Sequence, residues 1–125
     1  MMYKRLPDSE LEVMLVIWEA NEAVTRSYIE QRLPNQTLSP TTVLSFLSRL
    51  EEKGFVRVEK QGKKNLYTPL ISEQSYVEHE GKSMLEKLYG NSLKNFVASL
   101  YHGKAVDDKQ MEELREYLEK ERRKE

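Results

Sequence analysis

The chain has 125 residues, of which 38% are hydrophobic and 33% charged, with a formal net charge of −1 and no cysteine. This length suits one compact domain or a small domain with an appended element, and the absence of cysteine excludes disulfides, thiolate metal sites and cysteine nucleophiles. The longest apolar run, Val13 to Trp18, is too short to span a membrane. Because the N-terminus also lacks the apolar core of a signal peptide, we expect a cytoplasmic protein.

The first two expected elements are helices. Asp8 or Ser9 is the expected N-cap of a helix that runs to about Ala20, and its apolar residues cover most of its circumference, which predicts burial. The residues expected on one face are Leu11, Met14, Leu15 and Trp18. Thr25 is the expected cap of a second, shorter helix, which ends at Pro34.

A third helix is expected from Ser39 to Lys53. Ser39 suits the N-cap, Pro40 suits the first helical position, and Gly54 suits the left-handed residue that ends the helix. At about 100° per residue, one side is apolar: Val43, Phe46, Leu47 and Leu50. The opposite side carries short hydroxyls and a cation: Thr41, Thr42, Ser45, Ser48 and Arg49.

A β-hairpin is predicted directly after this helix. Val56 and Val58 alternate with charged residues as in a strand, the "QGKKN" segment forms a turn, and a return strand ends at Pro69. Between Arg49 and Lys64 there are six basic residues against three acidic ones, so positive charge is concentrated here although the whole chain is nearly neutral.

The C-terminal part is expected to be helical from Ser72 to Tyr101, with a break at Gly90, and again after a cap at Asp107 or Asp108. Its apolar stripe is too thin to make a core alone, so a second copy of the chain is the expected cover. The predicted dimer interface contains Val77, Leu85, Leu88, Leu93, Phe96, Val97, Leu100, Leu114 and Leu118. The predicted fold class is mainly α with a small β-hairpin: a winged helix-turn-helix domain over residues 1–70 and a helical dimerisation region over residues 71–125.

The hydroxyl side of the third helix has the properties that entry into the DNA major groove requires. Short side chains let the backbone come close, carboxylates are absent from its start, and the positive end of the helix dipole favours phosphate. The predicted DNA-binding residues are Ser39, Thr41, Thr42, Ser45 and Arg49 on the helix and Lys60, Lys63 and Lys64 on the hairpin. Alternatives remain at this point: Ser39 as a cap alone, Arg49 in a surface ion pair, and the lysines as a solvated turn.

Two other classes of function are alternatives to DNA binding. His79 and His102 are the only histidines, and neither has a nucleophile, carboxylate pair or glycine-rich loop placed to complete a site, so we expect no enzyme, no cofactor and no metal. A winged-helix protein-interaction module without DNA binding is the alternative. A salt titration separates the two, because DNA binding weakens steeply with salt.

Three segments, "LPDSELEVMLVIWE", "SPTTVLSFLSRLEEKGFV" and "GKKNLYTPLISEQSYV", resemble the penicillinase-repressor (BlaI/MecI/CopY) family. The resemblance implies a bacterial winged-helix repressor that binds a palindromic operator as a homodimer. It also implies a signalling protease as a partner in members that respond to β-lactams, and it places the cut between Ser99 and Leu100. Members cut in this way carry Asn-Phe at the cut, whereas here that pair, Asn95-Phe96, lies one turn earlier. Copper-responsive members carry cysteines that this chain lacks.

Overall fold

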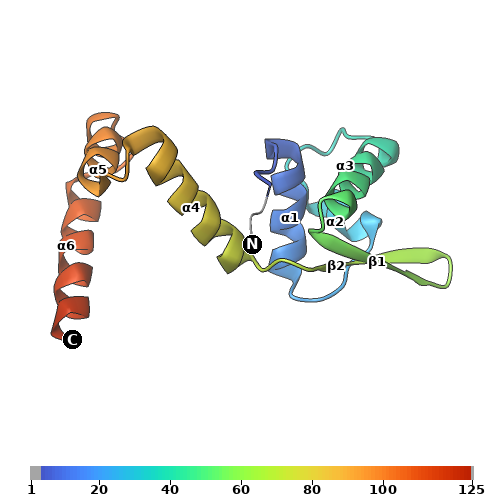
Figure 1. Ribbon diagram of the computed structural model, residues 1–125. Coiled ribbons are helices and arrows are strands. Elements are labelled where there is room, and N and C mark those ends of the chain that lie inside the picture. Colours follow the sequence, from blue (N-terminus) through green and yellow to red (C-terminus); the bar gives the residue numbers. More distant parts are fainter. Residues whose placement is uncertain (1–3, 125) are drawn as a thin grey trace. The chain divides into compact units, whose positions relative to one another are not determined.

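The computed structural model describes residues 4–124, and its contacts divide the chain into two compact units, Met1–Glu80 and Gly81–Glu125 (Figure 1). The elements in chain order are α1 (Asp8–Ala20), α2 (Arg26–Arg32), α3 (Pro40–Glu52), β1 (Val56–Gln61), β2 (Lys64–Pro69), α4 (Glu73–Tyr89), α5 (Leu93–His102) and α6 (Asp108–Arg123). The first turns of α4 belong to the first unit, in which Tyr76 is buried.

The first unit is a winged helix, which confirms the predicted fold class. Helices α1, α2 and α3 pack against one another, and β1 and β2 form an antiparallel hairpin beside them. A two-residue turn joins the strands, with Gly62 at a φ of 63° in the left-handed region that favours glycine. Val24, in the connection between α1 and α2, adds an antiparallel bridge to Tyr67 of β2.

Three aromatic rings join α4 to the core of this unit. The Tyr76 ring lies 5.7 Å from that of Trp18 and 5.6 Å from that of Phe55, measured between ring centroids. Its hydroxyl accepts a hydrogen bond from the Leu6 N–H at 2.9 Å, so the segment before α1 is tied to α4. Burial raises the pKa of Tyr76 above its ordinary value.

Helix α1 differs from its prediction at two points. It begins at Asp8 after Pro7, and no side chain caps it, so the prediction of an Asp8 or Ser9 cap is wrong. Leu15 is 44% exposed and not buried. The buried positions instead include Glu10, Val13, Met14 and Ile17, at the spacing of one helix face, because that is the side that α1 turns toward the other helices.

The second unit consists of the rest of α4 with α5 and α6. The predicted break between α4 and α5 is confirmed: Gly90 and Asn91 have φ values of 52° and 65°. Asp107 caps α6 in a capping box with Gln110, as predicted. No residue of α5 or α6 is buried, so the apolar side chains of these helices have no core of their own. Over residues 4–124, none of the helices has the length and apolar character needed to cross a membrane.

Candidate nucleic-acid interface

The start of α3 is built as the sequence predicts. The Ser39 hydroxyl accepts a hydrogen bond from the Thr42 N–H at 3.2 Å, and the two side-chain hydroxyls are 2.9 Å apart. Pro40 occupies the first helical position. The Ser39 cap is therefore confirmed, and it also fixes the hydroxyl of Thr42 at the same end of the helix.

One side of α3 is buried and the other faces solvent. Val43, Leu47 and Leu50 are buried, and Phe46 packs partly buried against the same core. On the other side Thr41 and Arg49 are exposed, while Thr42 and Ser45 are half-buried. The first turn contains no acidic residue, so nothing on α3 opposes the positive end of its dipole.

The six basic residues between Arg49 and Lys64 fall into two groups. Lys53 forms a buried ion pair with Glu10, with 2.5 Å between Nζ and Oε1, and Arg57 pairs with Glu59 at 2.7 Å. The other four form no ion pair with any residue of the described range 4–124, and all four are exposed: Arg49, Lys60, Lys63 and Lys64. These are the four cations that the sequence analysis assigned to DNA.

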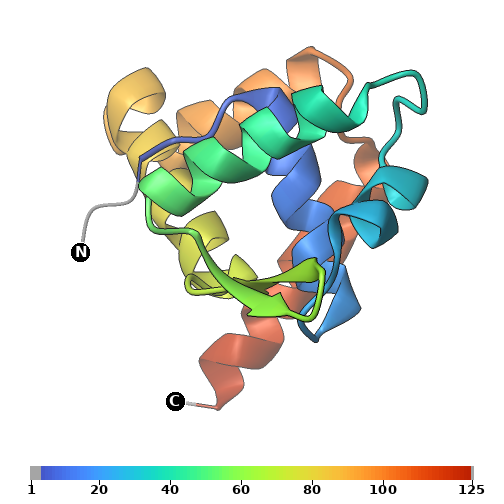
Figure 2. The same cartoon turned by 90° about the vertical axis from the view of Figure 1, so that its right-hand side faces the viewer.

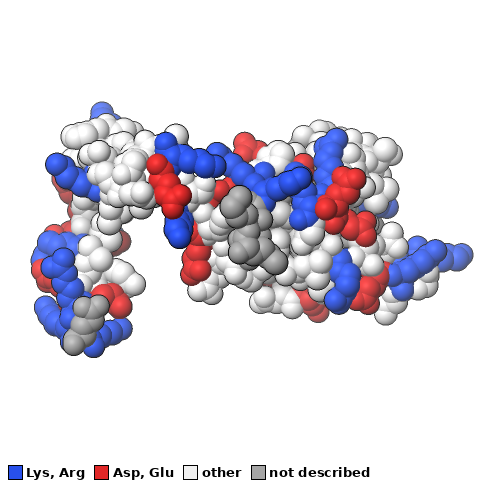
Figure 3. Space-filling view, in the orientation of Figure 1, with Lys and Arg blue, Asp and Glu red and all other residues white. Residues whose placement is uncertain are grey.

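The hairpin carries three of these cations at its far end. Lys60 is paired in register with Asn65, Lys64 with Gln61, and Lys63 lies in the turn between the strands. Basic side chains gather at this tip (Figure 3), and α3 and the hairpin lie on the same side of the first unit (Figure 2). The hydroxyl-bearing helix α3 and the hairpin with the basic tip are therefore neighbouring elements on one side of the unit.

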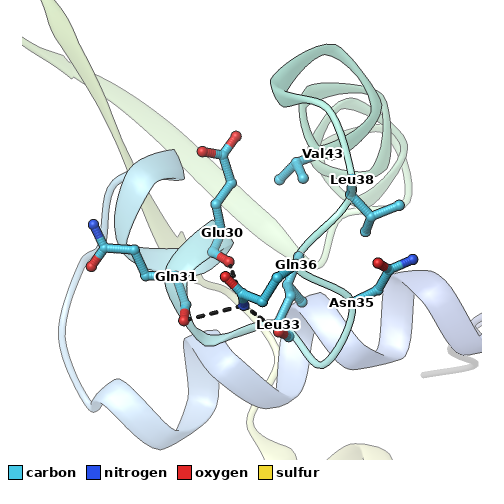
Figure 4. Close-up of a pocket in the computed structure, with 7 residues that line it drawn as sticks. All are labelled: Glu30, Gln31, Leu33, Asn35, Gln36, Leu38 and Val43. Atoms are coloured by element: carbon cyan, nitrogen blue, oxygen red, sulfur yellow. Dashed lines mark hydrogen bonds between the residues drawn. The ribbon is translucent and has the colours of Figure 1, made fainter.

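The turn between α2 and α3 is fixed by a residue that the sequence analysis missed. The Gln36 amide nitrogen donates to the backbone carbonyls of Glu30, Gln31 and Leu33 at 3.1, 3.3 and 2.6 Å, which satisfies carbonyls at the end of α2 (Figure 4). A pocket of about 240 Å³ lies beside it, bordered by Leu38 and Val43 of the α3 start. The sequence predicted that α2 ends near Pro34, but it did not predict that the Gln36 side chain would bond to the last carbonyls of the helix.

Leu44 is a second residue that the sequence analysis did not assign. It lies on α3 three residues after Thr41, and 43% of its surface is exposed. The helical spacing from Thr41 to Leu44 and on to Ser48 was the available signal for it.

The predicted dimer and cleavage residues lie on α4, α5 and α6. The exposed members of the predicted interface are Val77, Leu88, Leu93, Leu114 and Leu118, and the half-buried ones are Leu85, Phe96, Val97 and Leu100. Val77 belongs to the first unit and the others to the second. The Ser99–Leu100 peptide lies inside α5, where the Ser99 hydroxyl is 2.8 Å from that of Tyr89.

The known proteins that the chain resembles include repressors and regulators of one type. The chain is 35% identical to the penicillinase repressor of Bacillus licheniformis over 119 residues, which cover 93% of each chain. It is 28% identical to the methicillin resistance regulatory protein MecI of Staphylococcus aureus strain N315, over 92% of this chain and 94% of that protein. The solution structure of the DNA-binding domain of the repressor BlaI matches with a TM-score of 0.51 and 36% identity, over 60% of this chain and 94% of that one. Since the profile of the penicillinase repressor also matches residues 6–120, the chain belongs to the penicillinase repressor family.

Proposed function

We propose that this protein represses transcription by binding a palindromic operator as a homodimer, with α3 in the major groove and the hairpin on the adjacent phosphates. The family is one of DNA-binding transcriptional repressors and not of enzymes. The observation that carries the proposal is the position of four exposed cations without an ion pair in residues 4–124. Arg49 lies on α3 and Lys60, Lys63 and Lys64 on the hairpin, and these two elements lie on the same side of the first unit.

In this proposal α3 and the hairpin make different kinds of contact with DNA. Thr41, Thr42 and Ser45 offer hydroxyls that bond to phosphates or base edges, and Arg49 reaches the guanine edge or a phosphate. Lys60, Lys63 and Lys64 neutralise backbone charge without reading sequence, since a lysine contact to phosphate carries no base information. Specificity would then come from α3 and much of the affinity from the hairpin.

The exposed apolar side chains of the second unit support the proposed dimer. Leu88, Leu93 and Leu118 are 69%, 60% and 45% exposed in the single chain, and Leu114 and Tyr117 of α6 are exposed too. One exposed leucine is ordinary, but several on neighbouring elements favour an interaction surface. A second copy that covers them gives a two-fold dimer, and a two-fold dimer of winged-helix heads requires a palindromic operator.

Proteolysis in α5 is the mechanism of derepression that we propose. The Ser99–Leu100 peptide is held in regular helix, and its carbonyl, that of Ser99, accepts a hydrogen bond from the Gly103 N–H at 2.9 Å. A signalling protease would therefore need this turn to open first. Cleavage would separate α6 from the rest of the proposed interface.

The test is a binding titration on duplexes selected from a random pool with the full chain. Arg49→Ala should weaken binding to the selected duplex by about 1–3 kcal/mol, because it removes a base or phosphate contact. Arg122→Ala is the matched control, since Arg122 is also exposed and has no ion pair within residues 4–124, but lies in α6. Equal affinities of the two variants would remove Arg49 from the interface. If no duplex is retained, or if affinity is flat across a salt series, the protein-interaction module becomes the better account.

A further inference from the structure

Leu44 does not fit the chemistry of the surface on which it lies. Thr41 precedes it by three residues and Ser48 follows it by four, so all three are neighbours on one side of α3. It is 43% exposed and is not among the apolar side chains packed against the core. A large apolar group therefore stands among hydroxyls on the side of α3 that we propose faces DNA.

An exposed leucine is not by itself unusual. Single apolar residues are common on protein surfaces, and Leu15 on α1 is just as exposed, at 44%. What distinguishes Leu44 is its position in the first half of α3, because the N-terminal residues of a recognition helix are those that contact base edges. A leucine offers no hydrogen bond to a phosphate or to a base edge. The apolar feature that the major groove presents is the C5-methyl group of thymine.

We propose that Leu44 contacts the methyl group of a thymine in each half of the operator and so helps to determine sequence specificity. The inference rests on the proposed function. The neighbouring hydroxyls of Thr41 and Ser48 can donate or accept, and therefore discriminate weakly between bases. An apolar contact discriminates differently, because cytosine presents no methyl group at the same position. Leu44 would thus supply a selectivity that the hydroxyls lack.

The experiment uses the full chain and a duplex selected from a random pool, in which each thymine is replaced in turn by deoxyuridine. This replacement removes only the methyl group. For one thymine in each half-site, replacement by deoxyuridine should weaken binding of the wild-type chain about fourfold. This factor corresponds to roughly 0.8 kcal/mol, the value for burying one methylene-sized group. In Leu44→Ala, the thymine and uracil duplexes should bind equally well.

Leu15→Ala is the matched control, because it removes the same side chain at the same exposure from a different helix. It should keep the fourfold uracil effect. Equal thermal unfolding midpoints for the wild type and Leu44→Ala, expected for an exposed site, would tie the change to DNA contact. The inference is overturned if no thymine shows a methyl effect with the wild-type chain, or if the effect persists in Leu44→Ala. Either result leaves the proposed function standing, whereas failure to select any duplex would overturn both.

Discussion

The ion pair between Glu10 and Lys53 joins the first turn of α1 to the end of α3, and its removal tests how firmly α3 is held in the first unit. The Glu10 side chain is 3% exposed and that of Lys53 is 20% exposed, with 2.5 Å between Oε1 and Nζ. Removing one partner of a buried pair leaves the other charge uncompensated, which costs about 3–5 kcal/mol of stability.

The two single variants should differ because their stranded partners differ in exposure. Lys53→Ala leaves a carboxylate that is almost fully enclosed, so we expect the free energy of unfolding to fall by about 3–5 kcal/mol. Glu10→Gln leaves the Lys53 ammonium group, which can reach water because its side chain is long and flexible. We therefore expect the free energy of unfolding to fall by only about 1–2 kcal/mol. Replacing both partners, as Glu10→Leu with Lys53→Met, should restore stability to near that of the wild type.

Urea unfolding is the assay, at one fixed protein concentration because the stability of the proposed dimer would depend on that concentration. Arg57→Ala serves as the control, since it breaks an ion pair whose side chains are 56% and 58% exposed and should cost less than about 1 kcal/mol. If Lys53→Ala lost no more stability than Arg57→Ala, the Glu10 carboxylate would be hydrated and this reasoning would be wrong.

Three further predictions concern the hairpin, the dimer and the core. Lys63→Ala should reduce the magnitude of the log–log salt slope of operator binding by about 0.9 for each protomer bound, measured by titrations at several salt concentrations; an unchanged slope would remove Lys63 from the phosphate contacts. Leu88→Asp should sediment as a monomer, whereas Lys87→Asp should remain a dimer; a dimeric Leu88→Asp would place the interface elsewhere. Because burial raises the pKa of Tyr76, the unfolded chain releases this proton first as pH rises, so wild-type stability should fall above about pH 10. Tyr76→Phe should lack that part of the fall, and identical pH profiles would contradict it.

The elements whose ends depend on local chemistry were predictable from the sequence. Ser39 caps α3, Thr25 caps α2 and Asp107 caps α6, each through a hydrogen bond to a backbone N–H three residues later. Gly54, which follows α3, has a φ of 81°, which glycine adopts without strain. In each case the helix end depends on residues that are close together in the chain, so the local sequence predicts it.

The features that depend on distant residues were not predictable. Helix α1 is apolar on nearly all sides, so its periodicity could not say that Glu10 would face inward and Leu15 outward. The partner of Glu10 lies 43 residues away at Lys53, and no local pattern connects them. Tyr76 lies in the segment that we predicted to belong to the C-terminal region. Its ring instead packs against Trp18 and Phe55 in the first unit, which removes it from water.

Ion pairs also determine which basic residues between Arg49 and Lys64 stay unpaired, in a chain whose net charge is −1. Among the six basic residues from Arg49 to Lys64, Lys53 and Arg57 pair with carboxylates, so the cations of this segment without an ion pair in residues 4–124 are Arg49 and the three lysines of the hairpin tip. Glu51 and Glu52 lie exposed at the other end of α3, where negative charge is unfavourable to the helix dipole. In the proposed complex these two carboxylates would disfavour phosphate near them, Arg49 in the same last turn would be the cation of α3 that offsets them, and the start of α3 would attract phosphate. The orientation of α3 on DNA would therefore be determined by charge along the helix before any base is read, with the hydroxyls and Leu44 selecting among sequences afterwards.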